Sequence, residues 1–328
     1  MKVLRTLCVS VALLSMGACD RLQSMIAPPP PPLDGASLII EIDAAAAANK
    51  QLEELSDQMA DTLRVAGVRY TGRGVLDGAV RIRLIDPAEL DEALAALAPI
   101  TGHLNVTTTP EGMIEGRYKE EYASQAVAAL TEQAMPIIER RLHGLRAAVE
   151  AHAPGQLRIR TSDPVVPDMV KYVVGQQGVI SFHMVREISA EERQSGALPI
   201  GTMLVAPYGA GQPEIVQRRP EFTGERLSRA NPSTDPQTGE FVLSFALDPE
   251  GTQRFCRITR EHTGDRFAIL FDGMVLTAPT INEPICGGSG QISGHFTAES
   301  ANQLAIMLRA GALPAPFHIV EERTATSP

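Results

Sequence analysis

The order of strand and helix patterns in residues 36–110 is the feature that most constrains this fold. Residues 37–43 (SLIIEID) and 79–84 (AVRIRL) have the composition and alternation of strands. Residues 49–66 carry apolar side chains three and four positions apart and end before a glycine, as an amphipathic helix does. Further patterns predict a strand at 68–70, a helix starting at Asp86-Pro87 and a strand at 103–109. This β-α-β-β-α-β order predicts a ferredoxin-like unit.

The same order recurs in residues 111–186, which predicts a second ferredoxin-like unit in tandem with the first. Its longest segment, residues 121–148, is predicted as a helix in which Pro136 introduces a kink. The other predicted elements are strands at 113–119, 149–153, 156–161 and 179–185 and a helix at 167–174. Together the two units would form a base of the α+β class.

A third unit is predicted over residues 187–311, where Pro- and Gly-rich loops with short strands replace the long periodic segments. Its predicted elements are a helix at 248–263, strands at 267–272, 275–277 and 291–296, and a helix from the cap Thr297 to Arg309. Residues 312–328 contain a last strand, at 314–322. We expect this strand to return and pair with an earlier unit.

The N-terminal segment indicates export. Residues 1–18 have a basic start, an apolar run and small residues at their end, which is typical of a secretory signal peptide. The small residues directly before Cys19 resemble a lipobox, so we expect Cys19 to be lipidated. An uncleaved membrane anchor is the alternative, although the apolar run of about 14 residues is short for a spanning helix. In enteric bacteria Asp20 would retain such a lipoprotein at the inner membrane.

Residues 19–35 are predicted to be a tether between the lipid and the folded part. Five consecutive prolines at positions 28–32 favour a stiff polyproline II spacer. Acyl chains would hold the protein on the outer side of the cytoplasmic membrane, because each buried methylene contributes about 0.8 kcal/mol.

Charge and aromatic content exclude one class of partner. The chain has 29 basic and 39 acidic residues, a net charge of −10, which repels phosphate backbones. Aromatic residues make up 4% of the chain and Trp is absent, so base stacking has little support. We therefore expect no nucleic-acid partner.

Two cysteines remain once Cys19 is acylated and residues 1–18 are removed. Cys256 and Cys286 would form a disulfide in an oxidising compartment and close a loop of about 30 residues, contributing roughly 3–4 kcal/mol. Two buried free thiols are the alternative. The sequence leaves both open.

No constellation in the sequence carries catalytic chemistry. The histidines are scattered without metal-ligand spacing, and no serine lies in a nucleophile elbow. Gly287-Gly288-Ser289-Gly290 precedes a predicted strand instead of a helix, so it is predicted to be a tight turn and no phosphate loop. We expect no enzymatic activity, no metal and no cofactor.

Several motifs resemble the large extracytoplasmic domain of SecD, a membrane subunit of the bacterial Sec protein-export machinery. Leu33-Asp34-Gly35 followed by LIIEID (residues 38–43) resembles a decayed form of the family's opening strand motif, and residues 130–145 (LTEQAMPIIERRLHGL) resemble one of its helices. Asp272-Gly273 and Ala278-Pro279 match a hairpin of the family. The most distinctive run, residues 308–324, contains Leu308, Arg309, Gly311, Ala312, Leu313 and Pro314.

The resemblance implies two ferredoxin-like units as a base and a mobile head that grasps preproteins. In the family the -EERT- segment leads into membrane helices that couple proton flow to this motion, whereas this chain stops at Pro328. The main hypothesis is a lipid-anchored, SecD-like accessory factor that binds unfolded secreted chains, beside full-length SecD and SecF or the Sec channel. The alternative is a structural envelope lipoprotein that keeps the fold and binds one folded partner. The loops of 187–240 and the hairpin around Gly273 are the predicted contact surface.

Overall fold

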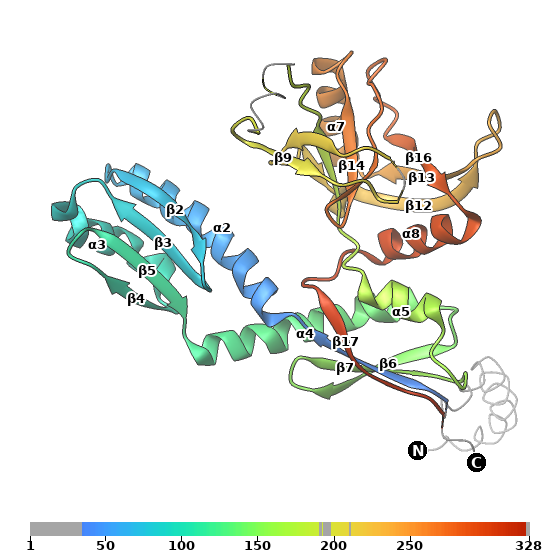
Figure 1. The fold of residues 1–328 in the computed structure, drawn as a ribbon, viewed down its shortest axis with the longest axis horizontal. Helices are drawn as coiled ribbons and strands as arrows, with labels where there is room; N and C mark the ends of the chain where they lie inside the picture. The colour runs from blue at the N-terminus through green and yellow to red at the C-terminus, as the bar shows by residue number, and fades with distance from the viewer. Residues whose placement is uncertain (1–34, 190–191, 193–197, 210, 326–328) are drawn as a thin grey trace, which may run out of the picture.

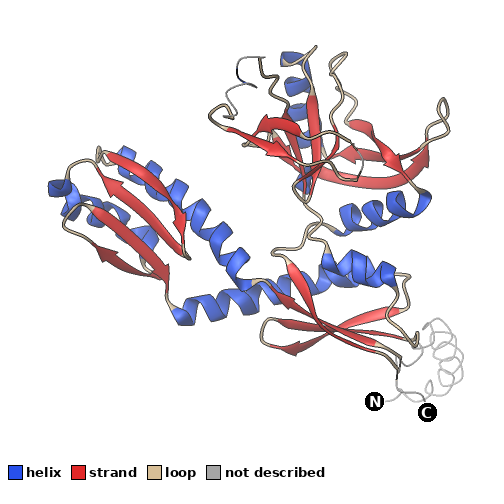
Figure 2. Cartoon of the chain, viewed as in Figure 1, coloured by secondary structure: helices blue, strands red, loops and turns tan. Residues whose placement is uncertain are grey.

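A computed structural model describes residues 35–189, 192, 198–209 and 211–325 (Figures 1 and 2). The signal peptide, Cys19, Asp20 and nearly all of the tether lie outside the described residues. Three bodies of mixed helix and strand can be followed in Figure 1: one at the left, one at the lower right beside the chain ends, and one above it. We call them the distal unit, the base and the head. The predicted α+β class is confirmed.

The distal unit comprises residues 44–118. Its sheet has the order β2-β3-β5-β4, formed by β2 (Tyr70–Leu76), β3 (Ala79–Leu84), β5 (Met113–Tyr118) and β4 (Leu104–Thr108). Helices α2 (Ala44–Val65) and α3 (Leu90–Thr101), the latter preceded by the 3-10 turn η1 (Pro87–Glu89), pack on one face. The apolar positions of α2 that predicted a helix, Leu52, Leu55, Met59 and Leu63, are all buried in this core.

The base has the sheet order β17-β1-β7-β6. These strands are β17 (Phe317–Arg323), β1 (Ser37–Ile42), β7 (Gln156–Thr161) and β6 (Ala147–Ala153). Helix α4 (Glu120–Leu142), which has Pro136 inside it, contacts β6 and β7, and α5 (Asp168–Gly175) contacts α4 and β17. All neighbouring strands are antiparallel, and the order of the base elements is that of one split βαβ unit.

The strand pairing corrects the predicted tandem arrangement. β1 does not pair within the distal sheet, and β5, predicted to open the second unit, takes its place beside β3 and β4. The cause is local: a turn at 109–112 is closed by Thr109 N–H to Met113 O (2.9 Å), which folds β4 and β5 into a hairpin. The distal unit is thus inserted into the base between β1 and α4. The two units are therefore nested, and the distal unit has the element order α-β-β-α-β-β in place of the predicted β-α-β-β-α-β.

A second difference concerns β8 (Ile180–Met184), which was predicted to complete the second unit. β8 leaves the base and pairs with β14 (Phe267–Phe271) and β11 (Phe222–Thr223) in the head, in a sheet of order β11-β8-β14-β15 with β15 (Met274–Thr277). Its place beside β1 is taken by β17, about 140 residues later in the chain. The head is therefore also an insertion into the base, between α5 and β17.

The rest of the head, as far as the structure describes it, includes two further sheets and the helices α7 and α8. One sheet has the order β12-β13-β16, formed by β12 (Leu227–Thr234), β13 (Phe241–Leu247) and β16 (Ser289–Phe296), with the 3-10 turn η2 (Gly224–Arg226) before β12. The other is the hairpin of β9 (Thr202–Val205) and β10 (Glu214–Gln217). Helix α8 (Ala298–Ala310) packs on β12 and β13, and α7 (Pro249–Glu261) packs Phe255 against Phe182 and Phe222.

Candidate functional site

The β9–β10 hairpin presents apolar side chains beside an unpaired strand edge. β9 pairs with β10 on one side, and no other strand of the described residues pairs with its outer edge. Ile200, just before β9, is 105% exposed, and Leu204 within β9 is 58% exposed. An unpaired edge offers backbone donors and acceptors, and exposed apolar side chains gain free energy when another chain covers them. These features together suit the binding of an extended polypeptide.

An ion-pair cluster fixes this hairpin to the rest of the head. The guanidinium of Arg266 donates to both carboxylate oxygens of Glu214 in β10, over 3.0 and 2.6 Å, and to the carbonyl oxygen of Ala278 over 3.2 Å. The bond to Glu214 raises the pKa of Arg266. Arg266 precedes β14 directly, so the hairpin is held against the central sheet at one defined position.

A cleft of about 250 Å³ adjoins the hairpin where it meets β15 and β16. Within it, His295 has a left-handed φ of 51° at an irregularity in the pairing of β16 with β13. A non-glycine residue in this conformation carries backbone strain that the surroundings must hold. The other lining residues are Pro207, Gly211, Gln212, Glu214, Glu240, Val275–Ala278, Ser293 and Gly294.

The predicted motif Asp272-Gly273 forms the tight turn between β14 and β15. Both residues have left-handed φ values, 45° and 77°, as a type I′ turn requires. The Asp272 carboxylate accepts hydrogen bonds from the backbone N–H groups of Val179 (2.7 Å) and Gly178 (3.0 Å). These two residues connect the base to the head, so the Asp272 side chain faces this connection.

The connection between base and head, which we call the neck, comprises residues 176–179 and 311–316. A hydrogen bond joins its two segments: the backbone N–H of Leu313 donates to the carbonyl oxygen of Gln177 over 2.8 Å. The hydroxyl of Tyr172 in α5 also forms a hydrogen bond with that of Tyr208 in the head. Burial raises the pKa of Tyr172.

Arg141 lies fully buried at the neck and was not singled out by the sequence. Its guanidinium donates to the carbonyl oxygens of Val173, Gln176, Gln177 and Gly311, over 2.8, 2.5, 2.7 and 2.9 Å. Burial lowers the pKa of Arg141 to about 10, while nearby Asp272 acts in the opposite direction. The charge therefore persists at neutral pH and caps the C-terminal ends of α5 and α8. The signal in the sequence was its spacing from Ala134 and Ile138, which places Arg141 on the buried face of α4.

Apart from Asp272 and Gly273, the predicted motif residues lie in two places. Leu308 and Gly311–Pro314 line a neck cleft of about 330 Å³, together with Lys50, Gly178–Ile180, Thr223–Glu225 and Leu227. Arg309 donates to the carbonyl oxygen of Ala230 over 3.2 Å and ties α8 to β12. The second group lies in the loop between β15 and β16: Ala278, Pro279, Gly287 and Gly288.

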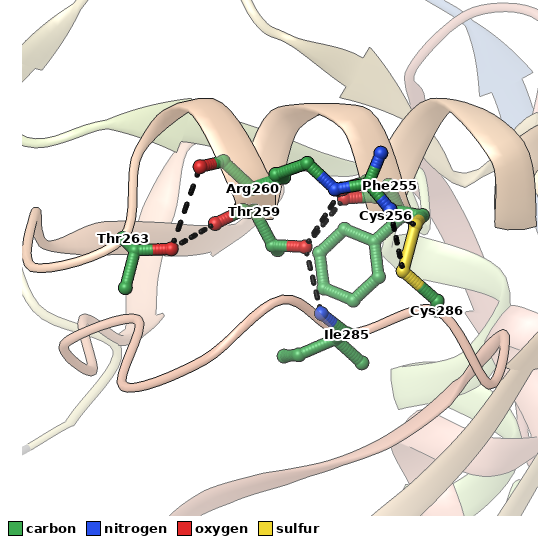
Figure 3. Close-up of a disulfide and its surroundings, with 7 residues drawn as sticks. All are labelled: Phe255, Cys256, Thr259, Arg260, Thr263, Ile285 and Cys286. Carbon is green, nitrogen blue, oxygen red and sulfur yellow. Dashed lines mark hydrogen bonds between the residues drawn. A yellow bond between two sulfur atoms is a disulfide. The ribbon is translucent and has the colours of Figure 1, made fainter.

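Cys256 in α7 and Cys286 in that loop form a disulfide with a Cα–Cα distance of 4.4 Å (Figure 3). Gly288, two residues on, has a φ of 67°, and a β-carbon there would lie 2.2 Å from Thr252 Oγ1 of α7. Glycine therefore permits the loop to approach the helix closely at this point.

Within the part of the chain that the structure describes, no group of three or more His, Cys, Asp or Glu side chains could hold a metal ion. Among the same residues, no helix has the length and apolarity needed to cross a membrane.

Comparison with known proteins agrees with this architecture. Residues 202–315, which lie in the head and the neck, match the model of the SecDF P1 head subdomain. The chain is 31% identical over 294 residues to the protein translocase subunit SecD of Rickettsia bellii (strain RML369-C), which covers 88% of this chain and 57% of the relative. It is 32% identical over 301 residues to that of Acetobacter pasteurianus (strain NBRC 105184 / IFO 3283-01), with the same two coverages. The predicted resemblance to SecD is confirmed.

The chain spans 57% of the length of these relatives. A crystal structure of SecDF in a super-membrane-facing form is 27% identical, with a TM-score of 0.48, over 59% of this chain and 28% of that one. A second structure, of a membrane component SecDF that enhances protein export, is 28% identical with a TM-score of 0.47 and covers 59% of this chain.

Proposed function

We propose that this chain is a lipid-anchored, SecD-like factor of protein export that binds unfolded polypeptides through its head, outside the cytoplasmic membrane. Its clients are secreted chains, and its partners in this role are full-length SecD and SecF or the Sec channel. The resemblance to SecD supports the role in export. The lipid on Cys19 and the tether keep the head near the site where chains emerge, which raises its effective concentration there.

One observation carries the client-binding step: the edge of β9 with which no strand of the described residues pairs lies beside the exposed side chains of Ile200 and Leu204. An unfolded segment can add a strand to this edge and cover both side chains. Such an interaction recognises the backbone of the client and its apolar side chains. It therefore tolerates many client sequences, as a factor with many clients requires. Weak binding is sufficient, because each holding event hinders backward diffusion of the chain.

The test measures the affinity of the purified protein for a permanently unfolded, fluorescently labelled polypeptide. The double variant Ile200→Ser/Leu204→Ser is expected to bind about tenfold more weakly, since it removes roughly 1–2 kcal/mol of apolar burial. The control is Leu76→Ser/Ile85→Ser, which removes two exposed apolar side chains from the distal unit. Equal affinities for the two double variants would contradict the proposal.

A further inference from the structure

The two cysteines of the head's disulfide differ in exposure. Cys286 is exposed in the loop before β16, whereas Cys256 is half-buried within α7. A thiolate from solution can therefore approach Cys286 Sγ more readily than Cys256 Sγ. Exposed disulfides are the ones that undergo exchange, while structural disulfides of secreted proteins resist reduction.

A cation lies beside both sulfur atoms. Arg260 is four residues after Cys256 on α7, so both side chains lie on one face of the helix. Its Nη2 atom is 3.5 Å from Cys256 Sγ and 3.8 Å from Cys286 Sγ (Figure 3). A guanidinium is permanently charged, and a positive charge next to a sulfur stabilises the thiolate form. Arg260 is thus placed to stabilise the leaving group when the disulfide is opened.

The loop stays attached to the helix independently of the disulfide. The backbone N–H of Ile285 donates to Thr259 Oγ1 over 2.8 Å, directly next to Cys286 (Figure 3). On its other side, Leu247 N–H donates to the carbonyl oxygen of Gly288 over 2.7 Å. After reduction these bonds keep the two thiols close together, which favours re-formation of the same pair. This arrangement suits a reversible disulfide.

We propose that Cys256–Cys286 is a thiol–disulfide exchange site whose substrate partner is a dithiol oxidoreductase. A thiolate of the partner attacks Cys286 Sγ and forms a mixed disulfide, while Cys256 leaves as a thiolate beside Arg260. The partner's second thiol then attacks its own sulfur in the mixed disulfide, and Cys286 is released. Two electrons and two protons pass to the head, and the partner dithiol becomes a disulfide. This inference goes beyond client binding. It rests on the proposed function only in that the location outside the cytoplasmic membrane decides which dithiol oxidoreductase the protein meets.

The test uses the purified mature protein in its oxidised form and dithiothreitol as the dithiol. The rate of reduction is followed by alkylating the free thiols at set times and measuring the mass of the intact protein by mass spectrometry. Arg260→Gln, which removes the charge, is expected to slow reduction by roughly threefold to tenfold. Arg260→Lys keeps the charge and is expected to restore most of the rate.

Arg257→Gln is the matched control, since it removes a charge from an exposed neighbouring position on α7. It is expected to be reduced at the wild-type rate. Two results would overturn the proposal: equal rates for Arg260→Gln and Arg257→Gln, or a wild-type disulfide that dithiothreitol opens only after the protein is denatured. Neither result bears on the affinity for unfolded clients, so the two proposals fail separately.

Discussion

The guanidinium of Arg141 donates a hydrogen bond to the carbonyl oxygen of Gly311 over 2.9 Å, joining residues 170 positions apart in the chain. Gly311 ends helix α8 of the head, and Arg141 belongs to α4 of the base. The same side chain reaches three carbonyl groups at and after the end of α5. One buried cation therefore holds the head to the base at the neck.

Replacement of this cation should destabilise the protein strongly. Arg141→Met removes the guanidinium donor from four carbonyl oxygens, and that of Gln177 keeps its bond from Leu313 N–H, so we expect a loss of about 3 kcal/mol in the free energy of unfolding. Urea titration monitored by circular dichroism measures this loss. The control Arg64→Met, at an exposed arginine in an ion pair with Asp61, should cost less than about 1 kcal/mol. Similar losses in the two variants would show that the neck contacts contribute little.

Two substitutions of Asp272 should lower the free energy of unfolding by different amounts. Asp272→Ala removes both acceptors for Gly178 and Val179 and places alanine in a left-handed conformation, for a loss of about 2–3 kcal/mol. Asp272→Asn keeps one acceptor oxygen and tolerates this conformation, so we expect a loss of about 1 kcal/mol. Urea titration of both variants is the measurement. An alanine variant as stable as the asparagine variant would contradict this account of the turn.

Removal of the disulfide should lower stability in a way that depends on redox conditions. Cys256→Ser/Cys286→Ser is expected to lose about 3–4 kcal/mol relative to the oxidised wild type, because a loop with a sequence separation of 30 is no longer closed. Thermal denaturation with and without dithiothreitol tests this expectation. The difference should disappear when the wild type is reduced. If the variant remains less stable than the wild type under reducing conditions, the loss of stability comes from the packing of the serines and not from the missing disulfide.

Stability should fall between neutral and mildly acidic pH because of His183. Burial lowers the pKa of this side chain, although its hydrogen bond to the carbonyl oxygen of Gln217 acts in the opposite direction. The unfolded chain then binds a proton at a higher pH than the folded chain does. Stability is therefore full above the ordinary histidine pKa of about 6.5 and decreases as pH falls below it. Unfolding free energies at pH 7.5 and 5.5 should differ less in His183→Gln than in the control His152→Gln, an exposed histidine. An equal pH dependence in both would contradict the assignment.

Local sequence patterns predicted most helices and strands of the base and the distal unit, since periodicity and caps act over a few residues. Thr297 caps α8 as expected, through a bond from Ser300 N–H, and Asp86 caps the 3-10 turn η1 before α3, through a bond from Ala88 N–H. Strand pairing was harder to predict, because it depends on contacts far apart in the chain. β17 rather than β8 lies beside β1, and only the tight turn at Gly112 gives a local sign that β5 pairs with β4.

The candidate site was less accessible to sequence reasoning than the fold. The short strands β9 and β10 lie in a Pro- and Gly-rich segment without clear periodicity, so the outer edge of β9 could be predicted only as part of the loops of 187–240. The hairpin around Gly273 was predicted as contact surface, whereas the Asp272 carboxylate is engaged at the neck. Arg141 gave little signal, because an arginine in a helix is more often exposed.

Site-specific photo-crosslinking in living cells tests the central claim most directly. A photoreactive amino acid is placed at Leu204 beside the β9 edge, or at Leu76 in the distal unit as control, and the crosslinked products are identified while secreted proteins are being exported. The account predicts that Leu204 captures many unrelated secreted chains and that Leu76 captures few. A single stoichiometric folded partner at Leu204, or no secreted chain at all, would contradict it.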